Sequence, residues 1–466
     1  MTSRTTSFVL PLLALLAGPD LAAAAQSKAF VLTSDFSSGS LSTVNLNSRV
    51  VSQDVEPAGS DAVMRWYGGN LYIVNRFGAD NVQVVNGLTL DTSHQFSTGN
   101  GSNPQDICFV SPTKAYVSRY ERTELLIVDP STGSSPGVIS LAAFADADGL
   151  PEMARMVRVD RYLFVALQRL DRNAFFSPTD SSLVAVIDTE TDTLVDVDPV
   201  APGVQAILLT GKNPVTTFEF DRATSRLLIG CVGFFGVLDG GAEWIDPVNF
   251  ASLGFAVTES VLGGDIGDIV WNGPARSYAI VSDASFNTLL VAWNTSGQNL
   301  GTLYAPGGFS LTDMALNDRG ELYVCNNSLL NPGLHVFAAA SGAHLAGPLD
   351  CGLPPSSVTF DAPSEQVLAV PVAAVANWLA APSPNPASQV SWLRFNAPLP
   401  MDARVTIHDA LGRRVRTLLD GPVAAGRVER AWDLRDDAGN AVAPGVYLVR
   451  LDRGGMVASR RIAVVR

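Results

Sequence analysis

The sequence predicts an all-β protein: a seven-bladed β-propeller, with eight blades as the alternative, followed by an immunoglobulin-like β-sandwich. Of its 466 residues, 47% are hydrophobic and only 16% are charged, and it contains 40 Gly and 28 Pro. This composition is typical of short strands joined by tight turns. A strand-rich unit recurs about every 40 to 60 residues, which is the period of a four-stranded propeller blade. The C-terminal segment instead has strands about ten residues apart, the pattern of a sandwich.

The N-terminal segment, residues 1–25, predicts a cleavable secretory signal. Arg4 precedes an apolar run at 8–17, and three small residues, Ala23 to Ala25, stand before Gln26. The apolar run is too short to cross a bilayer, and no later segment approaches the roughly 20 apolar residues that a membrane helix needs. We therefore expect an exported, soluble protein without a membrane span, on the outer cell surface or outside the cell.

Residues 26–378 form the predicted propeller. Each repeat begins with a turn and an inner strand, as in NPQDICFV at 103–110. It continues with a second strand, as in KAYVSRY at 114–120, and a third, as in ELLIVDP at 124–130. Six full copies can be traced, and the remaining blade would combine residues 29–46 with residues 356–370. Such a closure leaves the ring without exposed sheet edges.

The second and third strands of these repeats resemble the YVTN-type repeats of seven-bladed bacterial propellers. The segment LVAVIDTETDTLV at 183–195 is the most similar, and LLIGCVGFFGVLDGG at 227–241 departs most from the pattern. The resemblance covers residues 29 to about 370. It implies a ring of seven such blades.

A linker is predicted at 379–389, where APSPNPASQ contains prolines that cannot continue a central strand. The domain at 390–466 contains VTIHDALGRRVRTL, AWDLRDDAGNAVAPGVYLVRL and the closing RRIAVVR. With the PNP of the linker, this segment resembles the flagellar-hook-capping-type immunoglobulin-like domain and the related type IX secretion sorting domain. The resemblance implies a transport signal that engages outer-membrane export machinery, followed by surface attachment or release. An ordinary spacer domain is the alternative.

The charge distribution argues against nucleic-acid binding. The net charge is −14, but from Ala381 onward 13 Arg and 8 acidic residues leave a charge of +5, so the rest of the chain carries −19. An acidic body repels phosphate backbones, and the arginines of the tail are dispersed over a sandwich instead of forming a basic stripe.

Aligned repeats place charged residues at what we predict to be one face of the ring, the default binding face. Arginines follow the second strands, and aspartates stand at the start of the inner strands: Arg76, Arg119, Arg169, Asp61, Asp106, Asp268 and Asp313. Four converging carboxylates would repel one another unless arginines or a Ca²⁺ compensated them. Three interpretations remain open: local capping of backbone groups, a site for an anionic ligand, and a cation site.

Known catalytic signatures are absent from the sequence. The four histidines, at 94, 335, 344 and 408, do not have metal-ligand spacing, and there is no GxSxG elbow or Walker loop. We expect no cofactor, apart from the structural Ca²⁺ considered above. The four cysteines, at 108, 231, 325 and 351, are predicted to be buried thiols, with a Cys325–Cys351 disulfide as the alternative.

These observations favour a monomeric, exported binding protein whose propeller face takes a protein, a glycan or a small anionic ligand. An enzyme is the first alternative: a lyase or hydrolase that uses the carboxylates and arginines at the channel mouth. That alternative depends on fold analogy alone. A structural spacer of the cell envelope is the second.

Overall fold

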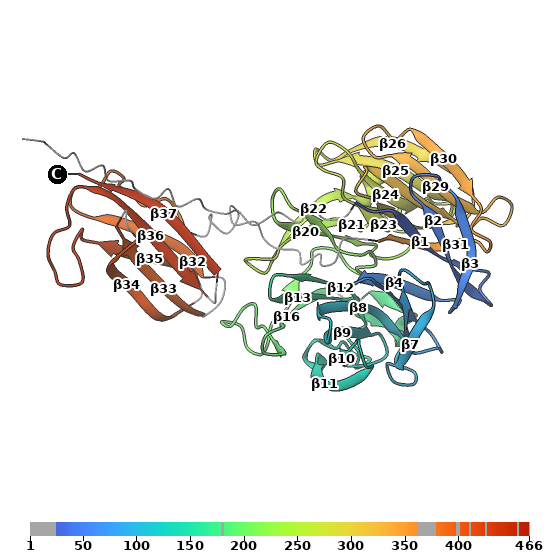
Figure 1. Cartoon of the computed structure of the whole chain (residues 1–466), viewed down its shortest axis with the longest axis horizontal. Helices are drawn as coiled ribbons and strands as arrows, with labels where there is room; N and C mark the ends of the chain where they lie inside the picture. The colour runs from blue at the N-terminus through green and yellow to red at the C-terminus, as the bar shows by residue number, and fades with distance from the viewer. Residues whose placement is uncertain are drawn as a thin grey trace, which may run out of the picture.

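The structure is a computed structural model, and it describes residues 25–178, 181–361, 379–397, 401–409, 412–424, 426–453 and 456–465. The predicted secretory signal at 1–25 lies outside these ranges except for Ala25, and so does the end of the predicted propeller at 362–378. In Figure 1 the strands up to β31 surround a common centre, and the strands from β32 onward form a separate group.

The described part of the chain forms seven antiparallel sheets that we number as blades 1 to 7, each given from the centre outward. Blade 1 contains β4 (Ala62–Tyr67), β5 (Asn70–Asn75), β6 (Asn81–Asn86) and β7 (Thr92–Ser97). Blade 2 contains β8 (Pro104–Ser111), β9 (Lys114–Arg119), β10 (Glu124–Asp129) and β11 (Ser134–Ser140). Blade 3 contains β12 (Met153–Val159), β13 (Tyr162–Leu167), β16 (Leu183–Asp188) and β17 (Thr193–Leu194), with β18 (Ile207–Leu208) also paired to β16.

The second half of the ring repeats this order. Blade 4 contains β19 (Glu219–Asp221), β20 (Arg226–Cys231), β21 (Gly241–Asp246) and β22 (Ala251–Thr258). Blade 5 contains β23 (Asp265–Val270), β24 (Ser277–Ser282), β25 (Thr288–Asn294) and β26 (Gln298–Tyr304). Blade 6 contains β27 (Leu311–Leu316), β28 (Glu321–Asn326), β29 (Gly333–Ala338) and β30 (His344–Leu349).

Blade 7 closes the ring with strands from both ends of the propeller. Its inner strand β31 (Pro355–Phe360) pairs with β1 (Lys28–Ser34), which continues into β2 (Gly39–Asn45) and β3 (Val51–Ala58). The register aligns Ala29 with Phe360 and Val31 with Val358. The predicted composite blade is therefore confirmed, and the ring has seven blades, not eight.

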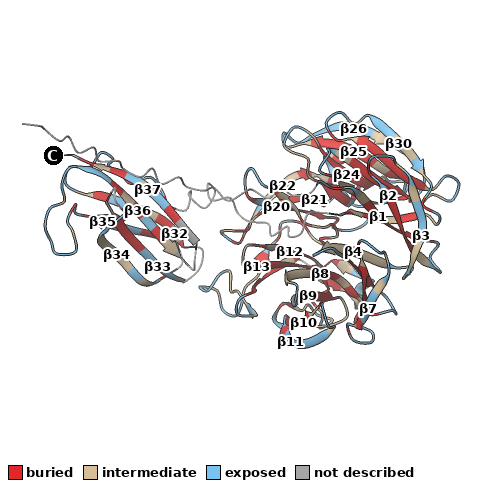
Figure 2. Ribbon diagram, in the orientation of Figure 1, coloured by how far each residue is buried: buried red, intermediate tan, exposed pale blue. Residues whose placement is uncertain are grey.

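Every interface between neighbouring blades has its own apolar core. Phe30 packs with Met64 between blades 7 and 1, Tyr116 with Leu163 between blades 2 and 3, and Leu228 with Ile266 between blades 4 and 5. The other four interfaces have equivalent clusters. Figure 2 shows these buried stretches along the middle strands of the blades. Because each sheet covers its apolar faces with its two neighbours, the ring is the unit that buries the core.

Short elements connect the strands. Between blades 2 and 3 lies the 3₁₀ turn η1 (Ala142–Phe144). The connection from β13 to β16 holds the hairpin β14 (Leu170–Asp171) and β15 (Ser177–Pro178), with η2 (Arg172–Ala174) between them. We call residues 168–178 the blade 3 insertion. The helix α1 (Glu259–Leu262) precedes blade 5. No helix within the described ranges is long and apolar enough to cross a membrane.

The C-terminal strands form a sandwich of two sheets. One pairs β32 (Ser391–Ala397) with β35 (Gly426–Trp432). The other has the order β34 (Arg414–Val423), β33 (Met401–His408), β36 (Gly445–Arg453) and β37 (Met456–Val464). Trp432 of the first sheet is fully buried and stacks edge-on against Tyr447 of the second, so the core lies between the two sheets as predicted.

The four cysteines are free thiols. Cys231, Cys325 and Cys351 are buried and Cys108 is partly buried. The alternative of a Cys325–Cys351 disulfide is wrong: both side chains pack as small apolar groups at the interface of blades 6 and 7.

Candidate functional site

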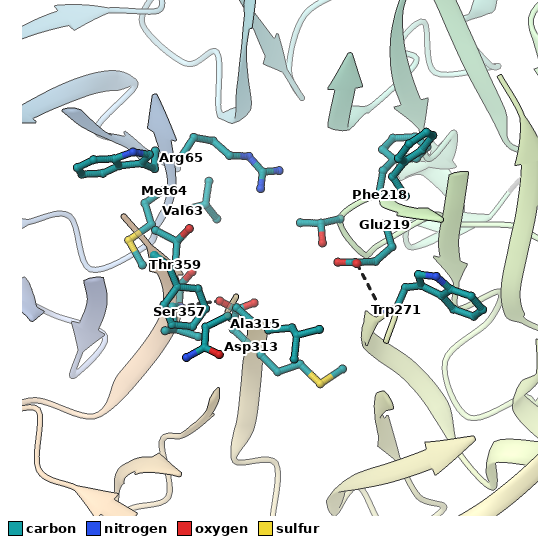
Figure 3. A pocket seen from close by; sticks show the side chains of 18 of the residues that line it. Val63, Met64, Arg65, Phe218, Glu219, Trp271, Asp313, Ala315, Ser357 and Thr359 are labelled. Atoms are coloured by element: carbon teal, nitrogen blue, oxygen red, sulfur yellow. Dashed lines mark hydrogen bonds between the residues drawn. The ribbon is translucent and has the colours of Figure 1, made fainter. Parts of the chain in front are cut away.

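The inner strands enclose a central cavity of about 640 Å³. Its walls come mainly from the inner strands of blades 1, 4, 6 and 7, together with Arg155 of blade 3 and Trp271, which follows the inner strand of blade 5. Figure 3 shows Arg65 and Glu219 pointing into this space from opposite sides. Asn317 and Asp318 also line it, and they follow β27. The cavity therefore reaches the end of the inner strands that lies opposite the predicted binding face.

Three of the predicted aspartates occupy equivalent positions on the inner strands. A β-bulge precedes Asp106, Asp268 and Asp313, and each pairs with the corresponding residue of its second strand. A bulge inserts one residue and redirects the side chains beside it. In all three blades the carboxylate then accepts hydrogen bonds from backbone N–H groups.

Each of these carboxylates joins its blade to the next one. Asp106 accepts from Ile107 N (2.9 Å) and from Met156 N (2.9 Å) of blade 3. Asp268 accepts from Ile269 N (2.9 Å) and from Met314 N (3.0 Å) of blade 6, and Asp313 accepts from Val358 N (2.8 Å) of blade 7. The predicted capping of backbone groups is thus present at all three positions.

The fourth aspartate does not belong to this group. Blade 1 has no bulge in its inner strand, so Val63, which pairs with Val74, occupies the position of Asp106. Asp61 lies before β4 with a side chain that is 46% exposed, and it accepts a hydrogen bond from Arg76 Nε at 2.9 Å. The predicted ring of four carboxylates at one mouth is therefore wrong.

The three predicted arginines follow the second strands, but none of them lines the cavity. Arg76 pairs with Asp61 and contacts Gln105. Arg119 donates to the carbonyl oxygens of Glu124 and Thr98, and burial lowers its pKa. Arg169 Nη1 donates to the carbonyl oxygen of Ser181 at 2.9 Å. These bonds fasten loops to strands.

Three other arginines line the cavity: Arg65, Arg155 and Arg222. Arg65 Nε and Nη2 donate to the two oxygens of Asp106 at 2.7 and 2.8 Å. Burial opposes its charge, but Asp106 more than compensates and raises the pKa of Arg65. Arg155 occupies the position in blade 3 that Asp106 occupies in blade 2.

Arg155 is only partly compensated. Its Nη1 donates to the carbonyl oxygen of Gln105 at 3.0 Å, and it forms no ion pair with a carboxylate of the described residues. Burial lowers the pKa of Arg155 to about 10, with Asp106 acting in the opposite direction. The guanidinium remains charged at neutral pH and can still accept an anionic partner.

Three carboxyl groups around the cavity, those of Glu219, Asp268 and Asp313, hold protons more strongly than usual. Burial raises the pKa of Glu219 to about 7, while its Oε2 accepts a hydrogen bond from Trp271 N at 3.3 Å. Burial and then the neighbouring Asp313 raise the pKa of Asp268 well above its ordinary value. Burial also raises the pKa of Asp313. A cavity with arginines and a carboxyl that titrates near neutrality can bind a small anionic molecule or exchange a proton with one.

A second feature lies on the face where the second strands end. In six of the seven blades the loop after the second strand carries exposed Phe or Leu side chains, from 38% exposed for Phe234 to 98% for Leu330. We call these residues the apolar loop tips: Phe36, Phe77, Phe175, Phe176, Phe234, Phe235, Phe286, Leu329 and Leu330. Blade 2 has Tyr120 in this loop, beneath the guanidinium of Arg172.

The apolar loop tips lie on the predicted binding face because all blades share one strand order and direction. From the sequence we considered only the polar residues of these loops and missed the apolar ones. The signal was nevertheless present, since an aromatic residue or Leu follows nearly every second strand, as in SDF, NRF, SRY and SLL.

Comparison with known proteins identifies the C-terminal region. Residues 388–454 match the family model of the FlgD Ig-like domain. No curated protein sequence matches the chain.

Three solved structures are similar to parts of the chain. One is PorZ, described as a bacterial surface component of the type IX secretion system of Porphyromonas gingivalis (14% identity, TM-score 0.41, 91% of this chain and 63% of that one). This chain thus spans less than two thirds of PorZ. The others are a functionally unknown protein from Desulfotomaculum acetoxidans (13%, TM-score 0.48, 72% and 98%) and hydrazine synthase of Kuenenia stuttgartiensis (15%, TM-score 0.46, 64% and 87%).

Proposed function

We propose that this chain is an exported bacterial β-propeller that binds a partner protein on the cell surface or in the medium. The apolar loop tips form the contact surface. The C-terminal domain serves as a sorting and attachment module. The observation that carries the proposal is the recurrence of exposed Phe or Leu at the same loop of six blades.

Exposed aromatic and aliphatic groups gathered on one face indicate a protein-binding surface, because water-exposed apolar area is costly and is covered on association. The loops after the second strands of six blades present exposed Phe or Leu side chains; Phe175 is 97% exposed and Phe36 is 83% exposed. A partner that covers several tips must be large, which favours a folded protein over a small ligand.

Three arginines beside the tips are already paired within the chain. Arg76 pairs with Asp61, Arg119 with Glu124, and Arg172 with Glu121. Binding should therefore draw mainly on apolar contact, and these arginines should contribute little to it. We therefore favour a protein-binding surface at the apolar loop tips over an anion site at Arg76, Arg119 and Arg169.

The C-terminal domain supports the proposed location. Its match to the FlgD Ig-like domain agrees with the motifs that resemble a type IX secretion sorting domain. The secretory signal predicted at 1–25 and the resemblance of the blades to YVTN-type repeats also favour a location outside the cell or on its surface. Export machinery of the outer membrane would then be a second partner, through this domain.

Site-specific crosslinking tests the proposed contact surface. A photoreactive phenylalanine analogue is placed at Phe286 or Phe77 in the producing cells, and at Leu88 as a control. Leu88 is 87% exposed, but it lies between β6 and β7, on the opposite face. We expect one discrete crosslinked protein from both tip positions and none from Leu88. Equal crosslinking at Leu88, or no product at either tip, would contradict the proposal.

Truncation tests the proposed role of the C-terminal domain. Removing residues 381–466 should retain the propeller inside the cell envelope, measured by mass spectrometry of medium and surface fractions. A chain without residues 1–25 serves as the control for the first export step. Unchanged export of the truncated chain would show that the domain is a spacer.

The central cavity favours a second candidate function, binding of a small dicarboxylate. The incompletely paired Arg155 carries this candidate. Succinate is a suitable probe: calorimetry should detect binding to the full chain and its loss in Arg155→Met, whereas Arg119→Met should bind unchanged. No heat with the wild type would exclude this ligand class, and turnover of the probe would favour the enzymatic alternative.

A further inference from the structure

The loop before blade 3 gathers three carboxylates that no part of the proposed function uses. Asp146, Asp148 and Glu152 each present an oxygen atom, and these three atoms lie within 4.8 Å of one another. The loop has the sequence DADGLPE. Gly149 adopts φ +90°, a conformation open to glycine, which turns the chain so that both aspartates and Glu152 face the same point.

Glu152 is fully buried, and one of its oxygens lacks a hydrogen bond. Its Oε2 accepts from Leu170 N at 3.2 Å, whereas Oε1 has no hydrogen-bond partner. Asp146 Oδ2 is a second buried oxygen of the cluster without one. A buried ionised carboxylate with an unsatisfied oxygen is costly, so the site needs a further positive group.

Arg172 does not supply enough positive charge. Its Nε lies 3.5 Å from Asp148 Oδ2 and 3.6 Å from Glu152 Oε1, beyond a good hydrogen bond, and its Nη1 pairs with Glu121. Nε and Nη2 are themselves buried without hydrogen-bond partners. One guanidinium therefore lies within ion-pair distance of three carboxyl groups, those of Glu121, Asp148 and Glu152.

We propose that Asp146, Asp148 and Glu152 bind one Ca²⁺. Calcium takes carboxylate oxygens at about 2.3–2.6 Å, so two oxygens on one ion stand up to about 5 Å apart. The separation of 4.8 Å or less is compatible with this geometry without rearrangement. The donors are all hard oxygens, which suit Ca²⁺ and disfavour zinc or copper. The site differs from the Ca²⁺ that the sequence suggested at the inner-strand aspartates.

The ion would join two segments of the binding face. Besides Leu170 N on Glu152, Arg172 N donates to Asp148 Oδ2 at 3.1 Å, so the carboxylates already hold the start of the blade 3 insertion. That insertion carries two of the apolar loop tips, Phe175 and Phe176. Binding of Ca²⁺ to the carboxylates should therefore stiffen the insertion as well as stabilise the fold.

Calorimetry and thermal unfolding of the full chain, freed of metal with a chelator, test this site. Titration with CaCl₂ should give one site per chain, and the Tm should rise with the Ca²⁺ concentration. The double variant Asp146→Asn/Asp148→Asn should lose affinity by about tenfold or more. Asp283→Asn is the matched control, because Asp283 also accepts backbone N–H bonds in an exposed loop of this face.

The wild type alone can refute the proposal, whether or not the variant folds. No heat and no Tm change with CaCl₂ would overturn it, and so would equal Ca²⁺ affinity in the double variant. Chymotryptic cleavage at Phe175 and Phe176 provides an independent measurement: Ca²⁺ should slow it in the wild type and in Asp283→Asn, but not in the double variant. Cleavage that ignores Ca²⁺ in the wild type would contradict the proposed link to the insertion.

Discussion

At the scale of single residues, Asp106 is a fully buried carboxylate with four hydrogen bonds. Its buried carboxylate accepts two bonds from Arg65, one from Ile107 N and one from Met156 N. It thereby compensates a cation of the cavity and joins blade 2 to blade 3. Such a fully bonded carboxylate is costly to replace, because each partner loses its acceptor.

Asp106→Asn should lower the free energy of unfolding by about 3–5 kcal/mol, the cost of breaking a buried ion pair. Asp61→Asn should lower it by only about 0–1 kcal/mol, because the Asp61 side chain is nearly half exposed and its pair with Arg76 is screened by water. Urea unfolding of both variants measures the difference. Similar losses would show that the Arg65–Asp106 pair stabilises the fold no more than the Arg76–Asp61 pair does.

Glu219 makes stability depend on pH. Its pKa rises from 4.5 to about 7 on folding because of burial. Between these values the unfolded carboxyl ionises while the folded one keeps its proton, so the wild type loses stability as the pH rises. Glu219→Gln carries no such group, and its stability relative to the wild type should increase from pH 4.5 to pH 8 in urea unfolding. A constant difference would contradict this, and Glu124→Gln on the rim is the control.

At the scale of elements, hydroxyl groups on second strands tie neighbouring blades together. Tyr278 of β24 donates to the carbonyl oxygen of Ala339 in blade 6 at 2.5 Å. Tyr116 of β9 donates to Asp192 in blade 3, and Tyr323 of β28 accepts from Arg49 in blade 7. Each partner lies in the loop between the third and fourth strands of the next blade. The repeat thus carries polar ties at its interfaces as well as an apolar core.

Two substitutions at Tyr278 separate these contributions. Tyr278→Phe removes only the hydroxyl and should cost about 1 kcal/mol, the net value of one hydrogen bond. Tyr278→Ala also empties a fully buried ring site and should cost about 3–5 kcal/mol. Denaturant unfolding compares them. If the two variants were equally stable, the aromatic ring of Tyr278 would not contribute to the packing of blades 5 and 6.

The repeats allowed the elements to be predicted, but not the positions of the functional side chains. The period and the turn residues sufficed for seven blades, the composite closure and the sandwich. A bulge was not visible in the sequence, however, so Asp61 was aligned with Asp106 although Val63 takes that place. We missed Glu219 and Arg65 because they line one cavity only after strands that are distant in sequence come together in the fold.

At the scale of the whole molecule, the ring is held together by noncovalent contacts, without a disulfide. Seven apolar clusters account for the seven interfaces, and the four cysteines take part only as thiols. Burial raises the pKa of Cys351 to about 12, and the same holds for Cys108. Such thiols are poor nucleophiles and should resist oxidation in the folded state.

A reducing agent should therefore leave the Tm of the full chain unchanged in differential scanning calorimetry. Alkylation supplies the control: all four cysteines should react in denaturant without prior reduction, and Cys231, Cys325 and Cys351 should be protected in the native protein. A Tm that falls on reduction, or a thiol that reacts only after reduction, would reveal a disulfide.

The pairing of β31 with β1 can form only late in the synthesis of the chain, because the two strands lie far apart in the sequence. Ala29 meets Phe360 only after some 330 intervening residues have emerged, which takes roughly 15 to 65 s at ordinary rates of synthesis. Until then β1 forms an unpaired edge of the sheet that it makes with β2 and β3. In the export that we propose, a chain that enters a channel during this interval has not yet closed its ring, so translocation would precede the pairing of β31 with β1.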